Sequence, residues 1–396
     1  MSSVTVAAIN VGASGPRIDK VLYEDGKYQI DRASRVKISK EDTRGQDFAE
    51  LIKTRVPWRY DLVSVGAAGP VKDGKNGKVC SMTHLNCHID EDVLTYVTGS
   101  KAFLCNDMPP MLAGADIVRA SDPDSTFVIN KGLGISTSGG RIVVAAGSGL
   151  GYGHSLSNGE VELIGPSEGG HDPFAQSNFK PTSDIEELLL HYMQHKYTDG
   201  DQITQEMVLR GDAIQDILSF LIELTNHRSD FRVTEETPLL IHELIKERNL
   251  PDSVRDRLAQ TGIDKSAVIS QAAESGESIH CIVADAMWKR LLGLYVGHKL
   301  QTDMPTRGAF LGGTPVNKAG TKLASVDKRF EPFTFMHGLR TREDSRFSDL
   351  VGGYPIYGQY NDNSFPIGLA RLALSKHGML AGADSSNVDN IPITVV

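Results

Sequence analysis

The chain has 396 residues, of which 40% are hydrophobic and 23% are charged, and its formal net charge is −9 at pH 7. This length exceeds what one hydrophobic core usually serves and predicts two domains, or one domain with a large insertion. The composition is typical of a soluble globular enzyme, and the acidic balance argues against a nucleic-acid-binding surface, which normally carries a basic face.

The sequence shows no sign of export or of a membrane span. No apolar run approaches the roughly 18 to 20 residues that a spanning helix needs, and the start MSSVTVAAIN lacks the basic and apolar regions of a signal peptide. Four cysteines in so long a chain are too few for a disulfide scaffold and fit a reducing compartment. We therefore expect a cytoplasmic protein.

The N-terminal segment reads as a strand followed by a glycine-containing turn. The strand covers residues 4–9 and leads into Asn10-Val11-Gly12-Ala13-Ser14-Gly15, after which residues 20–30 read as a further extended segment. Such a turn can wrap a phosphate, because glycine lets backbone N–H groups approach an anion closely. Taken alone, an ordinary β-hairpin turn is the preferred interpretation.

A candidate catalytic carboxylate follows a buried strand. Residues 41–56 have the apolar spacing of a helix packed on a sheet, and residues 61–65 and 101–104 read as short buried strands. The second strand leads to Asn106 and Asp107, and ligands of open α/β folds favour the carboxyl ends of sheet strands. An aspartate here can also cap the next helix, which is the commoner use, so both interpretations stay open at this point.

Two cysteines and two histidines lie close together between these strands, at Cys80, His84, Cys87 and His88. These residue types ligate zinc, but the spacing C-x3-H-x2-C-H matches none of the usual finger or ribbon patterns. Four ligands packed so tightly could hardly all face one ion. Structural zinc is therefore the minor interpretation, and the sequence leaves the metal ligands unknown.

The stretch at residues 141–174 combines two kinds of functional group. An apolar run at 142–146 enters the turn Gly147-Ser148-Gly149, whose backbone N–H groups suit an anion and make half of a phosphate site. After a polar turn at 157–159, an alternating strand leads to Glu168 and His171, a carboxylate and an imidazole that suit the hydroxyls of a polyol. A kinase that acts on a sugar needs this pairing.

The rest of the chain alternates between helical and extended patterns. Helices are expected at residues 185–197, 213–224, 251–258 and 279–299, and the last has the 3.6-residue pattern of a well-buried helix. A strand at 308–311 breaks at Gly312 and Gly313. The polar residues 340–353 read as a surface loop, and residues 354–357 as the last strand before a helix at about 365–376.

Taken together, these segments resemble the bacterial-type glucokinase family, in the family's order, from Asn10 to about Leu374. The most specific match is SEGGHDPFA at residues 167–175, and AAGSGLG at 145–151 is similar to the family's phosphate-binding GTGLG turn. Further similar segments are FLCNDM at 103–108, EMVLRG at 206–211 and GAFLGG at 308–313.

The resemblance implies an α/β chain with the two-domain actin-like (ribonuclease-H-like) sugar kinase fold and a cleft between the domains. The smaller domain would comprise residues 1–108, completed by a C-terminal helix at about 366–396, and the larger domain residues 109–365. The resemblance also makes a homodimer plausible. Nucleic-acid and membrane partners are not expected.

The resemblance implies a role for each candidate site residue as well. Asp107 would be the general base for the 6-hydroxyl of the sugar, which fits phosphoryl transfer, because that chemistry needs mainly positioning, charge neutralisation and one carboxylate on the attacking hydroxyl. The other hydroxyls would be held by Asn106, Glu168, His171 and Glu206. The nucleotide and its phosphates would be held by Asn10, Gly12, Ser14, Gly147, Ser148, Gly149, Gly312 and Gly313.

Three departures from the family pattern bear on activity. Asn10 stands where the family has an aspartate expected to hold hydrated magnesium near the transferring phosphate, and loss of that charge should weaken metal binding and slow transfer. Ala13 and Pro16 add bulk and stiffness where the backbone must approach phosphate. In MTHLNCHI, His84 and Cys87 replace the family's asparagine and tryptophan, which should alter the lining of the sugar pocket.

The sequence therefore predicts a hexose kinase that uses ATP and Mg²⁺, acts on glucose in the first place, and works through domain closure. The alternative is a glucokinase-like protein with little or no catalysis that binds sugar and acts as a sensor, and Asn10 motivates it. A kinase for another small polyol is the third interpretation. It would share the Asp107 base and differ in the sugar pocket.

Overall fold

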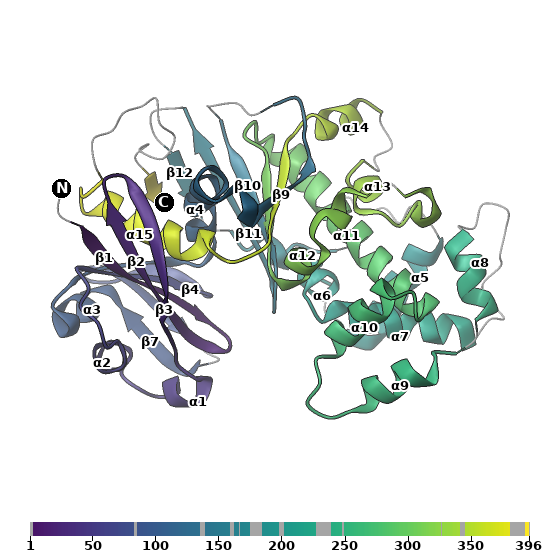
Figure 1. Ribbon diagram of the computed structural model, residues 1–396, viewed down its shortest axis with the longest axis horizontal. Helices are drawn as coiled ribbons and strands as arrows, with labels where there is room; N and C mark the ends of the chain where they lie inside the picture. The colour runs from purple at the N-terminus through teal and green to yellow at the C-terminus, as the bar shows by residue number, and fades with distance from the viewer. Residues whose placement is uncertain are drawn as a thin grey trace.

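A computed structural model gives the fold of the chain (Figure 1) and describes residues 3–82, 85–134, 139–158, 162–165, 167–174, 184–197, 202–226, 239–247, 249–325, 327–340, 345–380 and 393–395. Within these residues the strands form three sheets, which we name the N-terminal, the central and the small sheet. In Figure 1 the N-terminal sheet lies on the left, the central sheet in the middle and a group of helices on the right.

The N-terminal sheet has the order β3 (Lys27–Lys37), β2 (Gly15–Glu24), β1 (Val4–Gly12), β4 (Leu62–Ala67) and β8 (Lys101–Asn106). β1 runs antiparallel to β2 and parallel to β4, and β4 runs parallel to β8. The extended segment expected at 20–30 is two strands, because Asp25 and Gly26 both have positive φ and turn the chain back on itself.

Three helices and the small sheet complete this described part of the molecule. The helices are α1 (Lys40–Thr43), α2 (Phe48–Arg55) and α3 (Glu91–Thr98), and the small sheet contains β5 (Val71–Asp73), β6 (Lys78–Met82) and β7 (Cys87–Asp90). The single helix expected at 41–56 is wrong. Gly45 has φ +71°, and the Asp47 side chain accepts a hydrogen bond from the Glu50 backbone N–H, which starts α2 as a new helix.

The central sheet has the order β15 (Ile393–Val395), β12 (Glu162–Gly165), β11 (Leu150–Ser157), β10 (Arg141–Ala146), β13 (Ala309–Gly312), β14 (Ile356–Gln359) and β9 (Thr126–Asn130). β10, β13 and β14 are parallel, and β10, β11 and β12 follow one another antiparallel. The sequence pattern does not predict β11, because Gly151 and Gly153 lower its strand propensity. These glycines make room for Met108 and Leu112, which pack on the strand.

The remaining helices lie mostly on the right of Figure 1. They are α5 (Asp184–Tyr197), α6 (Gln205–Leu209), α7 (Ala213–Asn226), α8 (Leu239–Lys246), α9 (Asp252–Ala259), α10 (Lys265–Glu274), α11 (Ile279–Asp303), α12 (Thr314–Ala319), α13 (Phe335–Arg340) and α14 (Ser345–Gly352), with short 3-10 turns η2 (Pro123–Ser125), η3 (Gly169–His171), η4 (Gly320–Ala324) and η5 (Lys328–Phe330). Because residues 345–352 form α14, the surface loop expected at 340–353 is wrong.

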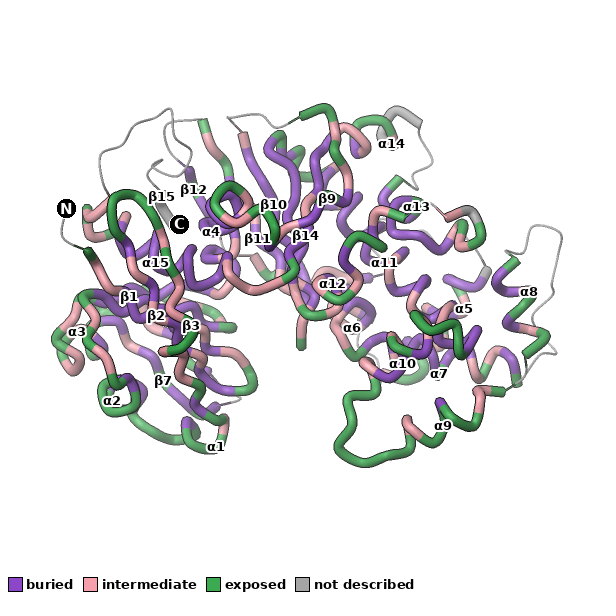
Figure 2. The backbone as a smooth tube through the Cα atoms, in the orientation of Figure 1, coloured by how far each residue is buried: buried purple, intermediate pink, exposed green. Residues whose placement is uncertain are grey.

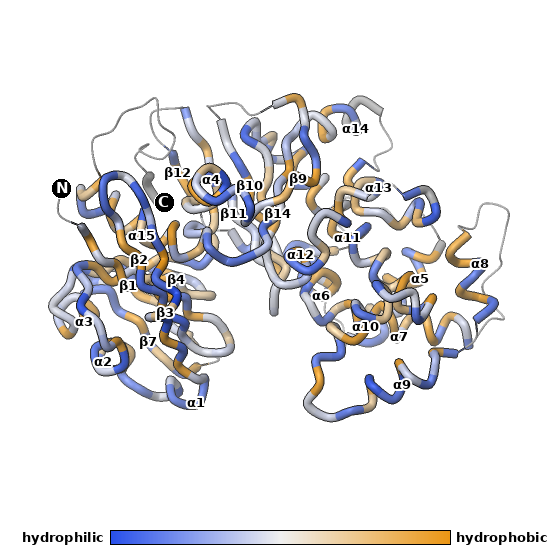
Figure 3. Tube along the Cα trace, in the orientation of Figure 1, coloured by the Kyte–Doolittle hydropathy of each residue, from blue (hydrophilic) through white to orange (hydrophobic). Residues whose placement is uncertain are grey.

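Burial and hydropathy separate these helices. α11 is buried along most of its length (Figure 2), as its sequence pattern predicts. α9 is largely exposed in Figure 2 and largely hydrophilic in Figure 3, so it lies at the surface of the helical group. In the described part of the chain, no helix is long and apolar enough to cross a membrane.

α4 (Met108–Ser121) and α15 (Ser364–Lys376) pack against each other, α4 on the central sheet and α15 on the N-terminal sheet. Their backbones meet at glycines, since a Cβ atom on Gly114 would overlap the Ser364 carbonyl and one on Gly368 would overlap the Pro110 carbonyl. α15 ends at Lys376, and β15 belongs to the central sheet. The division into domains at residues 108 and 365 stays a prediction.

Candidate active site

Asp107 lies where the N-terminal sheet meets α4. The parallel register places Asn10 of β1 beside Gly66 of β4, and Gly66 beside Cys105 of β8. Neighbouring strands are about 4.8 Å apart, so the backbones of Asn10 and Cys105 are roughly 10 Å apart. Both residues lie near the carboxyl ends of their parallel strands. Asp107 follows the carboxyl end of β8 and is the residue directly before α4.

Asn106, and not Asp107, caps α4. The Asn106 Oδ1 atom accepts a hydrogen bond from the Met108 backbone N–H over 3.0 Å, and Nδ2 donates to the Gly69 carbonyl over 3.3 Å. Asp107 occupies the N-cap position but makes no side-chain cap bond, so the capping interpretation of Asp107 is wrong. The amide expected on a sugar hydroxyl is thus engaged by protein groups, while the neighbouring carboxylate is not used to cap the helix.

The carboxyl group of Asp107 has an unusual acidity. Burial raises its pKa to about 6, a hydrogen bond from its own backbone N–H opposes this rise, and the negative charge of Glu168 adds a smaller increase. The effect of Glu168 also means that the two carboxylates lie within electrostatic reach of each other. A general base works best when its pKa is near the operating pH, and Asp107 meets that condition.

The turn Gly147–Gly149 joins β10 to β11 beside the start of α4. A Cβ atom on Gly151 would overlap the Met108 sulfur, so β11 touches the first residue of that helix. Within the turn, the Gly147 N–H donates to the Gly149 carbonyl over 2.8 Å. This bond removes Gly147 from the expected anion donors and leaves Ser148 and Gly149 as the candidates.

Glu206, which is expected to hold a sugar hydroxyl, contacts this same turn. Its Oε2 atom accepts from the Leu150 backbone N–H over 3.0 Å, and a Cβ atom on Gly149 would lie 2.8 Å from it. The Gly211 N–H donates to the Gly147 carbonyl over 2.7 Å. Glu206, in the first turn of α6, and Gly211, just after this helix, therefore hold the two ends of the glycine turn.

Glu168 and His171 lie together at the surface beside this region. The His171 Nε2 atom is 3.7 Å from the Glu168 Oε2 atom, and the two side chains are 61% and 68% exposed, so both can reach a ligand. Backbone hydrogen bonds join residues 172–174 to residues 203–205, directly before Glu206. Through these bonds the structure brings together three of the four residues expected on sugar hydroxyls.

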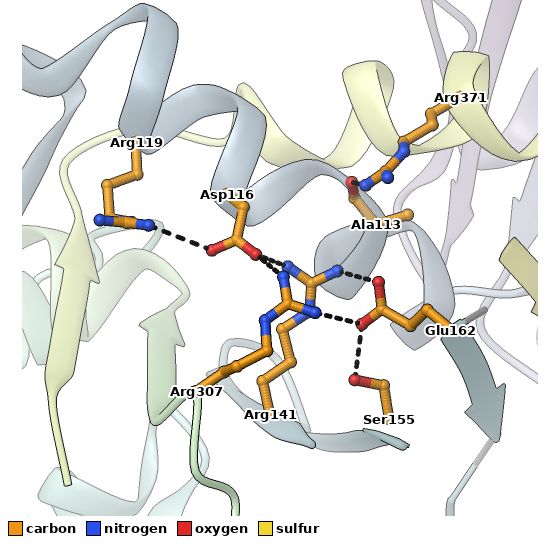
Figure 4. Close-up of polar contacts among 8 residues, drawn as sticks. All are labelled: Ala113, Asp116, Arg119, Arg141, Ser155, Glu162, Arg307 and Arg371. Atoms are coloured by element: carbon orange, nitrogen blue, oxygen red, sulfur yellow. Dashed lines mark hydrogen bonds and ion pairs between the residues drawn. The ribbon is translucent and has the colours of Figure 1, made fainter. Parts of the chain in front are cut away.

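A buried ion network fixes α4 on the central sheet (Figure 4). Asp116 of α4 contacts both Arg141, at the start of β10, and Arg307, just before β13. Arg141 also binds Glu162, at the start of β12, over 2.8 Å. Burial by itself would raise the pKa values of Asp116 and Glu162, but the arginines outweigh burial and lower both. The network therefore stays ionised and holds α4, the helix that begins directly after Asp107.

A pocket of about 410 Å³ extends from the glycine turn toward α7, α10, α11 and α12. Gly147 and Ser148 line one part of it, and Thr314, the first residue of α12, lines another. Gly313 precedes Thr314 with φ +96°, and a Cβ atom there would overlap the Ala146 carbonyl, so only glycine fits where the chain passes the end of β10. The two glycine turns thus open into one pocket.

Further residues line this pocket without any signal in the local sequence. Gln215 and Ser266 are hydrogen-bonded to each other over 3.0 Å, and Asp285 and Lys289 are ion-paired over 2.5 Å. Lys318 adds a second cation from α12. These residues come from four different helices, so only the packing of the helices brings them together.

The first glycine turn is a tight connection between β1 and β2. Gly12 pairs with Gly15, and the exposed residues Ala13 and Ser14 form the two-residue turn between them. Pro16 is buried as the second residue of β2, so its fixed backbone angle lies within the strand and not in the turn itself. The bulk expected in the turn is therefore limited to Ala13.

Other candidate residues differ in their surroundings. The half-buried Asn10 side chain has no hydrogen-bond partner within the described residues. Gly312 packs on Met111, whose Cε atom would lie 2.8 Å from a Cβ at that position. His84 lies outside the described residues, and Cys87 is buried in β7. In the ranges that the structure describes, no group of three or more His, Cys, Asp or Glu side chains is arranged to hold a metal ion.

Comparisons with known proteins show the family and the fold of the chain. The glucokinase family model matches residues 11–368. The chain is 27% identical to the glucokinase of Synechocystis sp. over 311 residues, which are 77% of this chain and 77% of the relative. The crystal structure of glucokinase from Balamuthia mandrillaris in complex with glucose has a similar fold, with a TM-score of 0.63 and 14% identity over 94% of this chain and 93% of that chain. The crystal structure of a ROK family glucokinase from Streptomyces griseus in complex with glucose and AMPPNP is also similar, with a TM-score of 0.53 and 18% identity over 93% of this chain and 99% of that chain. The fold is the two-domain actin-like sugar kinase fold.

Proposed function

We propose that this chain, which belongs to the glucokinase family, transfers the γ-phosphoryl group of ATP to the 6-hydroxyl of glucose with Asp107 as the general base. Family membership supports sugar kinase activity. The identity of the sugar, the identity of the donor and the roles of the residues are the proposal. Glucose is bound in both solved structures named above, and one of them also holds the ATP analogue AMPPNP.

The surroundings of Asp107 carry the proposal. Its carboxylate does not cap α4, has a pKa of about 6, and lies between the sheet edge and the helix start that contacts β11. A sugar held by Glu168 and His171 would present its hydroxyl to Asp107. Asp107 then orients the attacking oxygen and takes its proton as the new oxygen–phosphorus bond forms. The bond between the γ-phosphorus and the β–γ bridging oxygen breaks in the same step, and ADP leaves with that oxygen.

The nucleotide is assigned to the 410 Å³ pocket. Its phosphates would lie toward the backbone N–H groups of Ser148 and Gly149, because that end of the pocket is nearest to α4. The N-terminus of α4 adds a partial positive charge on the same side. Lys289 and Lys318 also line the pocket, where each is paired with an aspartate, Asp285 and Asp264, so the backbone N–H groups carry the assignment of the phosphates. Phosphate and sugar thus approach Asp107 from two directions.

Magnesium enters as part of the substrate, in complex with ATP. Mg²⁺ usually keeps several waters and binds through one or two carboxylates in addition to substrate phosphates. Asn10 has a side-chain oxygen that no described residue uses, so it fits a hydrated ion but brings no charge. The ion offsets phosphate charge during transfer. We therefore expect a high magnesium requirement.

A sugar-binding protein with little or no catalysis is the second candidate function. The observation that favours it is the neutral side chain of Asn10, which lies near the same carboxyl ends of the parallel strands as Asp107. The groups expected on the sugar do not depend on Asn10, so sugar would still bind. Only the transfer step would be lost.

Phosphorylation of glucose by the purified chain tests both candidates. The assay contains ATP and Mg²⁺ and includes the Asp107→Ala and Asn10→Asp variants. Sugar phosphate that forms with the parent chain and disappears with Asp107→Ala supports the kinase, and Asn10→Asp should raise its rate or lower its magnesium requirement. No product from either the parent or Asn10→Asp, with glucose binding still seen by calorimetry, would overturn the kinase proposal in favour of the sugar-binding protein.

A further inference from the structure

One face of α11 reaches both parts of the candidate site. Asp285, Trp288 and Lys289 line the nucleotide pocket, and Tyr295 and Lys299 follow further along the same helix. Residues 288 and 299 are about three turns and roughly 16 Å apart along the helix axis, so their side chains lie on the same face. A single rigid element therefore runs from the nucleotide pocket to the region of η3.

Lys299 contacts the segment that carries Glu168 and His171. Its Nζ atom is 2.6 Å from Oδ2 of Asp172, the residue after His171, and 4.4 Å from the centre of the Tyr152 ring. The Lys299 side chain is only 10% exposed, so water screens its charge little. A poorly hydrated cation needs its partner anion, and the ion pair with Asp172 is therefore strongly favoured.

Tyr295 makes a second connection to the same segment. Its hydroxyl donates to the Gly169 carbonyl over 3.0 Å. A Cβ atom on Gly169 would lie 2.7 Å from the Tyr152 ring and 3.2 Å from Lys299 Nζ, so glycine lets the turn approach both. η3 is thus packed between β11 on one side and α11 on the other.

α11 also holds the helix that bears Glu206. The Trp288 Nε1 atom donates to the carbonyl of Leu209 in α6 over 3.2 Å. Trp288 is buried and lines the nucleotide pocket. The nucleotide pocket, the Glu206 helix and the Glu168–His171 segment therefore all contact one helix.

We propose that Lys299 is a positioning residue that fixes the Glu168–His171 segment on α11, and that α11 thereby couples sugar binding to nucleotide binding. The inference rests on the proposed function, because it takes Glu168 and His171 as sugar ligands. Sugar that holds η3 in place also fixes the position of α11 through Lys299. Because α11 is rigid, its nucleotide-lining part then needs less repositioning when ATP binds, and the reverse holds when ATP binds first.

Two variants and a matched control test Lys299. Lys299→Met keeps the length of the side chain and removes its charge, and Lys299→Arg restores the charge. The control is Lys196→Met, because Lys196 of α5 also pairs with an aspartate, Asp216, over 2.5 Å and also lies near tyrosine rings. If the loss of any such Lys–Asp pair weakened glucose binding, Lys299→Met and Lys196→Met would weaken it equally. If Lys299 positions the Glu168–His171 segment, only Lys299→Met would weaken it.

Binding is followed in a Trp58→Phe background, in which Trp288 is the one remaining tryptophan. We expect Lys299→Met to weaken glucose binding by about tenfold or more, the usual effect of losing a hydrogen bond to a charged group. The KM for glucose should rise more than kcat falls. Saturating glucose should tighten nucleotide binding in the parent by about fivefold or more, and this ratio should approach one in Lys299→Met. Lys299→Arg should restore both values, and Lys196→Met should change neither.

Several outcomes would overturn the assignment of Lys299: unchanged glucose affinity in Lys299→Met, an equal loss in Lys196→Met, no rescue by Lys299→Arg, or no coupling in the parent. A parent chain that binds glucose and nucleotide with coupling but forms no sugar phosphate would contradict the proposed function and leave the assignment intact. A parent chain that binds no glucose would overturn both.

Discussion

The Glu206 carboxylate accepts a hydrogen bond from the backbone N–H of Leu150 over 3.0 Å. Leu150 begins β11 directly after the glycine turn, so a side chain expected on the sugar also shapes the backbone expected on phosphate. Gly149 lies against the same carboxylate oxygen. Glu206 and the turn therefore form one unit, and a change in either should affect both substrates.

Replacement of Glu206 by alanine should raise the KM values for both ATP and glucose. A hydrogen bond to a charged group contributes about 1.5–3 kcal/mol, which corresponds to a tenfold effect or more. Glu206→Gln keeps an acceptor oxygen for Leu150 and should retain most of the ATP affinity. Steady-state kinetics with each substrate varied in turn measures both values. An unchanged KM for ATP in Glu206→Ala would show that the Leu150 contact does not support the nucleotide site.

Gly170→Ala should destabilise the fold and weaken glucose binding. A Cβ atom at Gly170 would overlap the Leu150 carbonyl, so either η3 or β11 must move, and such overpacking costs about 1–3 kcal/mol. Gly165→Ala is the matched control, because its Cβ atom would meet the His154 ring at an ordinary distance of 3.6 Å. Thermal unfolding of both variants checks the prediction. Equal melting temperatures for the two would contradict the crowded environment of Gly170.

Activity should rise with pH through a value near 6. A general base must be ionised to accept a proton, and burial raises the pKa of Asp107 to about 6. The kcat/KM for glucose, which reports the ionisation of the free enzyme, should therefore fall on the acid side of this value. A pH–rate profile between pH 5 and 8 measures it. A rate that is flat over this range would argue against Asp107 as the base.

Ionisation of Asp107 should raise activity but lower the stability of the fold. The folded state holds this proton more tightly than the unfolded chain, whose ordinary value is 3.8, so stability falls as pH rises from about 4 to about 6. A shift of about two pH units corresponds to roughly 3 kcal/mol. Asp107→Asn should thus be inactive yet melt at a higher temperature than the parent at pH 7.5. The gain should shrink toward pH 5, and a less stable variant at pH 7.5 would refute the argument.

Removal of one carboxylate from the buried network should be costly. Glu162 is fully buried and binds Arg141, so Glu162→Gln leaves buried positive charge without compensation, at a cost of about 3–5 kcal/mol. Glu50→Gln is the control, because the exposed pair of Glu50 with Lys53 contributes at most about 1 kcal/mol. Urea unfolding midpoints measure the difference. Equal midpoints would mean that the network does not hold α4 on the central sheet.

Local sequence patterns predict the parts of the site that depend on a single segment. The glycine turn at Gly147 and the strand that leads to Asp107 follow from apolar runs and glycines that lie next to one another in the chain. The contact between Glu206 and Leu150 joins residues 56 positions apart, and no local pattern encodes it. In the same way, Lys299 reads as one polar residue on a helix until the fold places Asp172 beside it.

Capping chemistry is a second limit of sequence reasoning. Asn106 and Asp107 are both good cap residues, and the choice between them depends on which side chain points at the Met108 N–H. In the structure, the Asn106 side chain makes this contact. The same kind of choice at Asp47 divides α1 from α2, where apolar spacing alone predicts one helix.

Ser64 in β4 donates a hydrogen bond to the carbonyl of Leu369, over 2.8 Å and 305 positions along the chain. The face of the N-terminal sheet that buries Val6 and Leu62 is therefore covered by α15, a segment that is synthesised long after β4 and β8. Ribosomes add roughly 5–20 residues per second, so this apolar face waits on the order of 10–50 seconds between the synthesis of β8 and that of α15. The uncovered face of the N-terminal sheet is exposed to aggregation during this interval. The rate of translation therefore sets the earliest time at which α15 can cover this sheet and complete its native packing.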